Sequence, residues 1–179
     1  MGRSAVGKST IVHEVAQRMG LTILKSYTTR AMRNNESVET SDHIFIDADA
    51  VDQYKDDMVA YTERVGYCSF ATKQQILNSD FYIINPSGFY ELRQHTLSLD
   101  VELIPIYITI PYSTNLAHAT KRGDVENWKK NYEKESKEFT EFEKSGMIYY
   151  RILNDTSIDS AVSRLMGIVR KELGDICEK

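Results

Sequence analysis

The first nine residues contain the segment Gly2-Arg3-Ser4-Ala5-Val6-Gly7-Lys8-Ser9, which fits the pattern G-x-x-x-x-G-K-[ST] without a gap. Gly2 and Gly7 permit backbone angles that are closed to other residues, so consecutive N–H groups can turn inward and surround phosphate oxygens. Lys8 adds a mobile positive charge, and Ser9 opens a helix whose N-terminus faces the anion. The segment therefore predicts a phosphate loop, which normally joins a buried strand to a helix.

The predicted loop lies at the start of the chain, where only Met1 precedes Gly2. Because such a loop normally leaves the end of a strand, we expect the natural gene product to begin upstream of Met1. The positions of the pattern also indicate which residues would hold the phosphates and Mg²⁺ of ATP. They are Gly2, Ser4, Ala5, Val6, Gly7, Lys8, Ser9 and Thr10, with the Ser9 hydroxyl as the metal ligand.

Length and composition disfavour several other classes of protein. A chain of 179 residues is about the size of one domain. Its longest apolar stretches are too short to cross a membrane, and the N-terminus lacks the apolar segment and cleavage site of a secretory signal. A net charge of -4 disfavours a nucleic acid polymer as partner, because backbone binding needs a broad basic face. We expect a cytoplasmic protein that binds small molecules and no membrane.

Helical and extended periodicities alternate along the chain. Apolar residues at helical spacing follow Ser9, and Gly20 supplies a stop. Residues 102–110 are largely apolar and β-branched, which is typical of a strand covered on both faces of a parallel sheet. The alternation predicts a three-layer α/β fold with a parallel central sheet. We expect helices at 9–19, 47–55, 88–97, 127–144 and 158–173, and a further helix that begins at 73–77. We expect strands at 21–24, 44–46, 81–84, 102–110 and 149–153, and extended, partly looped chain at 61–70.

An ordered set of further segments resembles the guanylate kinase family over nearly the whole chain. The set begins with Ser26-Tyr27-Thr28-Thr29-Arg30-Ala31-Met32-Arg33 and Asp42-His43-Ile44-Phe45-Ile46, and it continues through 66–72, 85–88, 121–123 and Asn154-Asp155. The resemblance implies a P-loop kinase fold in a single domain, 1–179. Its core would comprise approximately 1–25, 77–120 and 147–179, with a small acceptor-binding region at 26–76 and a helical lid at 121–146.

The resemblance also implies which residues hold the phosphate of the acceptor nucleotide. The family's T-T-R-x-x-R segment carries over to Arg30 and Arg33, whose planar guanidinium groups suit bidentate bonds to phosphate oxygens. His43 replaces a family tyrosine and is still a donor. Phe70 replaces the second phosphate-binding tyrosine and has no hydroxyl, so one acceptor contact is expected to be lost.

The residues that would contact the acceptor base depart further from the family. Ser26 and Thr72 match family contacts, but the glutamate that accepts from guanine aligns with Ala60, and Glu63 is an alternative. Asn85 stands where the family has an aspartate. An amide offers both a donor and an acceptor, so base preference can differ from that of the family.

The family's lid aligns with Lys121-Arg122-Gly123, and Lys129 and Lys130 stand where later arginines would be. Phosphoryl transfer depends mostly on positioning and charge neutralisation, so cations that close over the γ-phosphate supply much of the rate. The resemblance places Asn154 near the adenine of ATP. The implied catalytic residues are Lys8, Arg122 and Lys130.

These observations predict an enzyme that transfers the γ-phosphoryl group of ATP, with Mg²⁺, to a nucleoside monophosphate, with GMP or dGMP as the first candidates. Two alternatives stay open: a guanylate-kinase-like binding module that has lost catalysis, and a P-loop kinase for a different small acceptor. The retained Lys8 and Ser9 favour an enzyme. A monomer or a homodimer is expected.

Overall fold

The computed structural model describes residues 1–32, 36–121, 123 and 125–174, and the chain divides into two units. One unit comprises Met1–Gly20 with Ile104–Lys179, and the other comprises Leu21–Leu103. The predicted phosphate loop belongs to the first unit, and the predicted acceptor residues belong to the second. The single-domain organisation and its three regions stay predictions.

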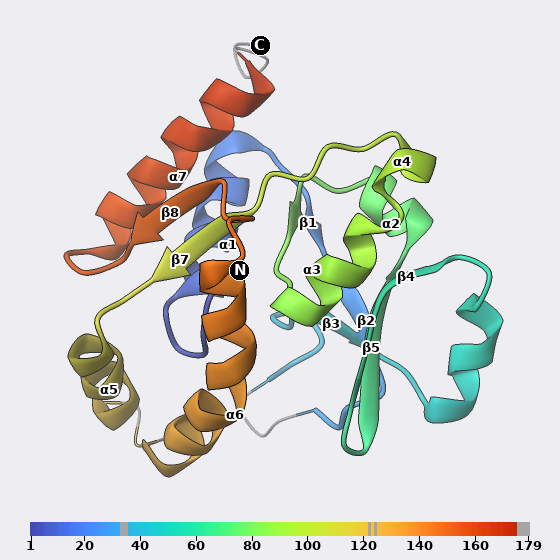
Figure 1. The fold of residues 1–179 in the computed structure, drawn as a ribbon, viewed down its shortest axis with the longest axis horizontal. Coiled ribbons are helices and arrows are strands. Elements are labelled where there is room, and N and C mark those ends of the chain that lie inside the picture. Colours follow the sequence, from blue (N-terminus) through green and yellow to red (C-terminus); the bar gives the residue numbers. More distant parts are fainter. Residues whose placement is uncertain (33–35, 122, 124, 175–179) are drawn as a thin grey trace. The chain divides into compact units, whose positions relative to one another are not determined.

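The first unit is built on a parallel pair of strands, β7 and β8, with Ile106 opposite Tyr150. Figure 1 shows β7 beside β8, with α7 running along β8. The α7 helix begins at the Ser157 cap, and it buries the apolar face that includes Val162 and Leu165. The elements are α1 (Lys8–Met19), β7 (Ile106–Thr109), α5 (Tyr112–Lys121), α6 (Val125–Lys144), β8 (Tyr150–Leu153) and α7 (Ile158–Leu173).

In the second unit, β1 pairs with β6 in parallel, and a second sheet has the strand order β3-β2-β5-β4. The β2–β3 pair is parallel, and the β2–β5 and β4–β5 pairs are antiparallel. The strands are β1 (Ile23–Leu24), β2 (Ser26–Thr28), β3 (His43–Phe45), β4 (Met58–Arg64), β5 (Tyr67–Thr72) and β6 (Phe81–Tyr82). The helices are the 3-10 helix η1 (Ala48–Tyr54), α2 (Lys73–Leu77), α3 (Pro86–Arg93) and α4 (Thr96–Leu99).

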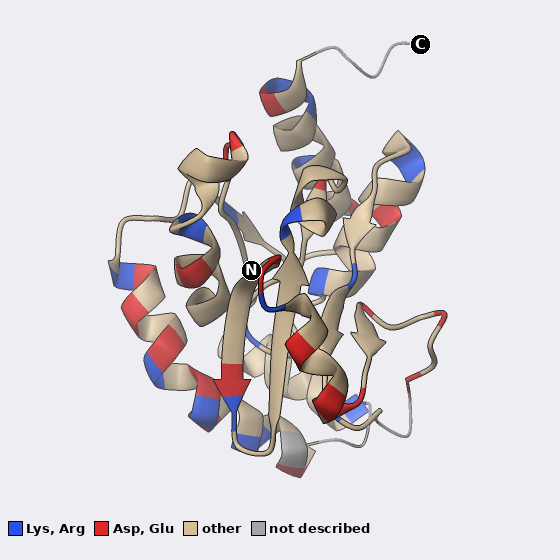
Figure 2. Ribbon diagram, turned by 90° about the vertical axis from the view of Figure 1, so that its right-hand side faces the viewer, with Lys and Arg blue, Asp and Glu red and all other residues tan. Residues whose placement is uncertain are grey.

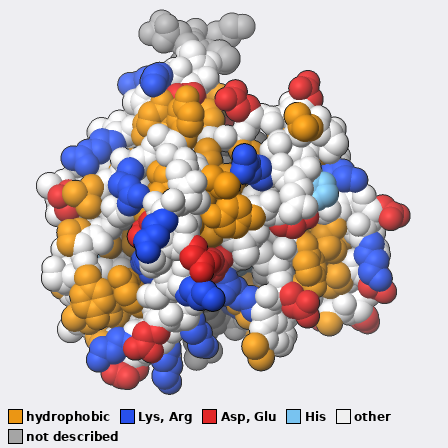
Figure 3. Space-filling model, in the orientation of Figure 1, with side chains coloured by type: hydrophobic (Ala, Val, Ile, Leu, Met, Phe, Trp, Pro, Cys, Tyr) orange, Lys and Arg blue, Asp and Glu red, His pale blue; other side chains and the backbone are white. Residues whose placement is uncertain are grey.

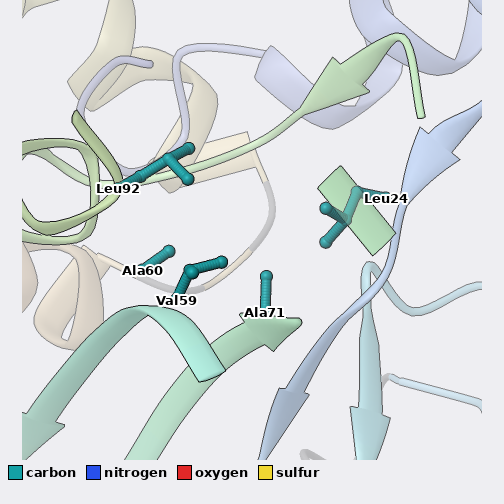
Figure 4. Close-up of a cluster of buried hydrophobic side chains, with 5 residues drawn as sticks. All are labelled: Leu24, Val59, Ala60, Ala71 and Leu92. Atoms are coloured by element: carbon teal, nitrogen blue, oxygen red, sulfur yellow. The ribbon is translucent and has the colours of Figure 1, made fainter. Parts of the chain in front are cut away.

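A cluster of buried aliphatic side chains holds the second unit together. Figure 4 shows its members, which are Leu24, Val59, Ala60, Ala71 and Leu92. Strand β4 is irregular within this cluster, because Ala60 takes a left-handed conformation (φ 56°) and the register to β5 shifts between Val59 and Thr62. The Tyr61 N–H next to the irregularity donates to the Glu91 carboxylate of α3 at 2.8 Å. The helix α3 is thus tied to the strand at the point where the ladder is interrupted.

Most predicted elements are confirmed: the helix at 158–173 matches to the residue, and a helix begins at Lys73 as predicted. The predicted strand at 102–110 is shorter, at Ile106–Thr109, because Pro105 has no N–H to donate to a ladder. The predicted helix at 88–97 is wrong in its bounds, since α3 ends at Arg93 and α4 begins at Thr96. Strand β2 and helix α5 were not predicted. Parallel pairing is confirmed in three strand pairs, whereas the three-layer arrangement stays a prediction.

Charges of both signs are interspersed along the ribbon, as Figure 2 shows. On the face drawn in Figure 3, blue and red side chains likewise alternate with apolar ones. No helix among the described residues combines the length and the apolar character that a membrane crossing needs.

Candidate functional site

The predicted phosphate loop adopts backbone angles that few sequences allow. Gly2 has φ 152°, Gly7 has φ 88°, and Ala5 between them also has a positive φ, 65°. A Cβ atom on Gly2 would lie 2.4 Å from the carbonyl oxygen of Ile108 in β7, so only glycine permits this approach. Gly7 is the N-cap of α1, and its carbonyl accepts the first helical hydrogen bond, from Ile11 N–H at 3.0 Å.

The chain enters the loop from beside β7. The Met1 amine donates to the carbonyl oxygen of Ile106 at 2.8 Å, and the Ile108 N–H donates to the carbonyl oxygen of Met1 at 2.9 Å. Reciprocal bonds of this kind are those of a neighbouring strand. The loop therefore leaves a strand-like residue and continues into α1, as the sequence pattern predicts.

Side chains from three elements bind carbonyl oxygens of the loop. Lys8 Nζ donates to the Arg3 carbonyl at 2.8 Å. Asn115 Nδ2, from α5, donates to the Ser4 carbonyl at 3.1 Å, and Asn154 Nδ2, after β8, donates to the Val6 carbonyl at 3.0 Å. The Ser4 and Val6 carbonyls accept from side chains outside the loop, so they are not free to turn toward an anion inside it. These bonds favour a loop whose N–H groups, apart from that of Ser4, can face an anion.

The residues that follow the loop are open to solvent. Ser9 and Thr10 lie in the first turn of α1 and are exposed. The N-terminal turn of a helix carries partial positive charge, which favours a phosphate there. Together with the bound carbonyls and the Lys8 ammonium group, this turn fits the polyphosphate of ATP, and the Ser9 hydroxyl fits a single protein ligand to nucleotide-bound Mg²⁺.

Two residues that were predicted to contact the nucleotide have hydrogen-bond partners within the protein. The Ser4 hydroxyl donates to Glu135 of α6 at 2.6 Å, and the Ser4 N–H donates to the same carboxylate at 2.9 Å. Ser4 is therefore held by α6, and its predicted contact with a phosphate stays a prediction. Asn154 is buried and binds the Val6 carbonyl, so its amide supports the phosphate loop, and its expected place near the adenine stays a prediction.

In the second unit, Arg30 is engaged by a carboxylate. Its two terminal nitrogens donate to the two oxygens of Glu36, at 2.8 and 2.9 Å. Its guanidinium carbon also lies 5.3 Å from the centre of the Phe45 ring. A carboxylate presents the same paired oxygens as a phosphate, so Glu36 lies where the resemblance expects the acceptor's anion. Arg33, the second predicted arginine, lies outside the described residues.

Two further polar residues predicted for the acceptor site, Ser26 and His43, contact one another. His43 Nδ1 and Ser26 Oγ lie 2.9 Å apart. Burial raises the pKa of the Tyr82 phenol, and a hydrogen bond with the Ser26 side chain opposes that rise. The structure thus brings Ser26, His43 and Tyr82 together, although Tyr82 was not predicted.

Three other predicted acceptor residues have structural roles. Phe70 is fully buried and stacks on Tyr27, with ring centres 5.3 Å apart. The Thr72 hydroxyl accepts from the Gln75 N–H, as the N-cap of α2. Asn85 Oδ1 accepts from the Gly88 N–H at 2.9 Å, as the N-cap of α3. The two caps satisfy backbone donors that a helix cannot satisfy internally, so these side chains are already committed to the fold.

The predicted lid cations lie at the ends of two helices. Lys121 is exposed at the end of α5, and Lys129 and Lys130 are exposed near the start of α6. Lys129 Nζ lies 3.7 Å from the Glu126 carboxylate. Arg122 lies outside the described residues. Lys130 is thus placed on α6 as a solvated cation, and its catalytic role stays a prediction.

Comparison with known proteins identifies the fold. No protein-family model matches the chain, and no curated protein sequence matches it. Its structure is similar to the crystal structure of guanylate kinase from Anaplasma phagocytophilum, with a TM-score of 0.63, 16% sequence identity, and coverage of 94% of this chain and 84% of that chain. The chain has a guanylate-kinase-like fold. At this identity the guanylate-kinase-like similarity concerns the arrangement of the backbone and not the chemistry of the site.

Sequence reasoning missed three residues that matter to the geometry. Asn115 lies on α5, which was not predicted, and Glu135 lies in a glutamate-rich stretch of the predicted helix at 127–144 that matches no motif. Glu36 lies six positions after Arg30, beyond the reach of any local pattern that was considered. Helical spacing of mixed polar and aromatic residues on α6 is the one signal that would have identified Glu135.

Proposed function

We propose that the protein transfers the γ-phosphoryl group of ATP to the phosphate of a nucleoside monophosphate. The observation that carries the proposal is the phosphate loop, whose Arg3, Ser4 and Val6 carbonyls are bound by Lys8, Asn115 and Asn154. This bonding supports a loop whose N–H groups bind an anion. A turn that only connects two elements does not require its carbonyls to be held in this way. The guanylate-kinase-like fold supports a nucleotide as the anion.

The proposed reaction is in-line attack by an oxygen of the acceptor phosphate on the γ-phosphorus of ATP. The bond from the γ-phosphorus to the bridging oxygen breaks, and ADP leaves with that oxygen. The acceptor phosphate is already anionic, so no general base is needed. Lys8, Arg122 and Lys130 are proposed to neutralise charge on the transferred group, and Mg²⁺ would be held by Ser9 together with phosphate oxygens and water.

GMP and dGMP are the first acceptors to test, because the T-T-R segment and the fold both resemble guanylate kinases. Arg30 and His43 are proposed to hold the acceptor phosphate. A different small acceptor is the second candidate. Two positions that would contact a guanine base favour this candidate. Asn85 Oδ1 already caps α3, and Ala60, which is buried and left-handed, has no carboxylate to accept from the base.

The test is ADP formation from ATP and Mg²⁺ with each of GMP, dGMP, AMP, CMP, UMP and dTMP. Lys8→Ala is the loss-of-function variant, and Lys137→Ala, which removes an exposed lysine from α6 of the same unit, is its matched control. We expect turnover that Lys8→Ala lowers by at least about a hundredfold and Lys137→Ala leaves intact. The proposal fails if the folded protein binds neither ATP nor ADP in calorimetry. Nucleotide binding without turnover of any acceptor in the panel would instead support the second candidate.

A further inference from the structure

The α6 helix presents one continuous face to Arg3 and Ser4 of the phosphate loop. The α6 residues in contact with them recur every three to four positions, twice as adjacent pairs, which is the spacing of side chains along one side of a helix. These residues are Tyr132, Glu135, Ser136, Phe139, Thr140 and Glu143. The contact therefore runs along three turns of α6.

Arg3 supplies the broader part of this contact. Its guanidinium nitrogens donate to Ser136 Oγ at 3.3 Å and to Thr140 Oγ1 at 3.2 Å, and one of them lies 3.7 Å from the Glu143 carboxylate. The same group lies 5.0 Å from the Tyr132 ring centre and 5.6 Å from the Phe139 ring centre. Only 12% of the Arg3 side chain is exposed. The Arg3 guanidinium group is therefore engaged in packing and hydrogen bonding with α6 and is not available to bind a ligand.

Glu135 supplies the more specific part. Its two carboxylate oxygens accept separately from the N–H and the hydroxyl of Ser4, at 2.9 and 2.6 Å. Hydrogen bonds to a charged acceptor are about twice as strong as neutral ones. The Ser4 carbonyl is bound at the same time by Asn115. The peptide groups on both sides of the Ser4 Cα atom and its side chain are thus all fixed from outside the loop.

The residue that follows this fixed point is in a strained conformation. Ala5 has φ 65°, and a left-handed conformation costs a residue with a Cβ atom roughly 1–2 kcal/mol. Such a conformation persists only where its surroundings enforce it. The bonds to Ser4 constrain the chain on one side of Ala5, and the bond from Asn154 to the Val6 carbonyl constrains it on the other. The strained turn lies between the two glycines of the loop, where the direction of the N–H groups is decided.

We propose that Glu135 is a positioning residue that holds the phosphate loop in its anion-binding conformation and ties that conformation to α6. Its carboxylate fixes the Ser4 N–H and hydroxyl, and this fixation maintains the left-handed Ala5. The consequence for ATP and ADP rests on the proposed function, whereas the consequence for the conformation of the loop does not. Loss of the Glu135 carboxylate therefore releases the loop even in the absence of nucleotide.

The test compares the full-length protein with Glu135→Ala, Glu135→Gln and the control Glu133→Ala, which changes an exposed carboxylate on the same helix. The first readout is amide hydrogen exchange of the peptide that contains residues 2–10, measured without ligand. The second is the Kd of ADP by calorimetry. We expect Glu135→Ala to accelerate exchange in the loop and to weaken ADP binding by about tenfold, because two charge-assisted hydrogen bonds are lost. Glu135→Gln keeps one carbonyl oxygen and should give a smaller change in both readouts, and Glu133→Ala should change neither.

Each other outcome is decisive. Unchanged loop exchange in Glu135→Ala overturns the proposal. Exchange that accelerates equally in β8 and α7 also overturns it, because that result shows general destabilisation of the unit. Faster loop exchange with an unchanged Kd of ADP removes the role in nucleotide binding. A wild-type protein that shows loop protection released by Glu135→Ala but binds no ADP supports the positioning role and refutes the proposed kinase function.

Discussion

Arg30 and Glu36 form a bidentate ion pair in which two guanidinium nitrogens donate to two carboxylate oxygens, at 2.8 and 2.9 Å. The Arg30 side chain is 13% exposed and the Glu36 side chain is 19% exposed, so solvent screens the pair only partly. Under the proposed function, a phosphate that binds Arg30 has to take over hydrogen bonds that Glu36 already holds.

Glu36→Gln should therefore strengthen binding of the acceptor phosphate. A neutral amide competes less well than a carboxylate for the guanidinium, and removal of one negative charge lowers repulsion of the incoming anion. We expect the Kd of GMP, measured by calorimetry at low ionic strength, to fall by about threefold to tenfold. Glu102→Gln, which neutralises an exposed carboxylate of the same unit, is the control. An unchanged or higher Kd of GMP in Glu36→Gln would show that Glu36 positions the Arg30 side chain and does not compete with the acceptor phosphate for it.

Gly7→Ala should disrupt the phosphate loop beyond the usual cost of a left-handed alanine. A Cβ atom on Gly7 would lie 2.9 Å from Asn154 Nδ2, the atom that holds the Val6 carbonyl. Gly66 has almost the same φ, 86° against 88°, but a Cβ atom there would meet nothing within 4 Å. We expect Gly66→Ala to lower the free energy of unfolding by about 1 kcal/mol and to leave ADP binding intact.

For Gly7→Ala we expect a larger loss of stability and a Kd of ADP raised by more than about tenfold. Urea denaturation and calorimetry provide the two measurements. Equal effects of the two substitutions on both quantities would contradict the role assigned to the contact between Gly7 and Asn154.

Phe70→Tyr should not create an acceptor contact, although it restores the residue type of the family. The Phe70 ring is fully buried between Tyr27 and Tyr54, with ring centres 5.3 and 5.5 Å apart. A hydroxyl added there lacks a prepared partner, which costs about 1–3 kcal/mol. We expect a lower thermal midpoint and an unchanged Kd of GMP, with Phe81→Tyr at a partly exposed ring as control. Tighter GMP binding by Phe70→Tyr would place its hydroxyl in the acceptor site after all.

Tyr107→Phe should reveal a stabilising hydrogen bond that disappears at alkaline pH. The Tyr107 hydroxyl donates to the Glu143 carboxylate at 2.6 Å, and burial, followed by this carboxylate, raises the pKa of the phenol. Below the unfolded pKa of about 10 the phenol is protonated in both states, so its contribution is fully present. As the pH rises through that value the unfolded chain loses a proton that the folded chain keeps, so the contribution falls.

The measurement is the free energy of unfolding of both proteins in urea, at about pH 8 and about pH 10.5. We expect Tyr107→Phe to be less stable by about 1–2 kcal/mol at the lower pH, because Glu143 loses a donor. The difference should shrink at the higher pH. A difference that is constant or that grows with pH would show that the phenol is not protected in the folded state.

Strong local signals determined most of the secondary structure. The helices at Lys73–Leu77 and Ile158–Leu173 follow from their caps and apolar spacing, which act within a few residues. Strand β2 at Ser26–Thr28 was missed because its residues also match an arginine-bearing loop of the resemblance. Its extended form depends on the β3 and β5 neighbours, and these contacts are distant in sequence.

The sequence by itself indicated the phosphate loop and the helix that follows, because the spacing of Gly2, Gly7 and Lys8 is a local pattern that does not depend on knowing what packs against it. Tertiary structure alone decided which side chains hold that loop. Asn115 and Glu135 reach Ser4 across more than a hundred residues of chain, at separations of 111 and 131 positions. Such bonds depend on the packing of α5 and α6 against the loop, and no local periodicity encodes the partner of a side chain at that distance.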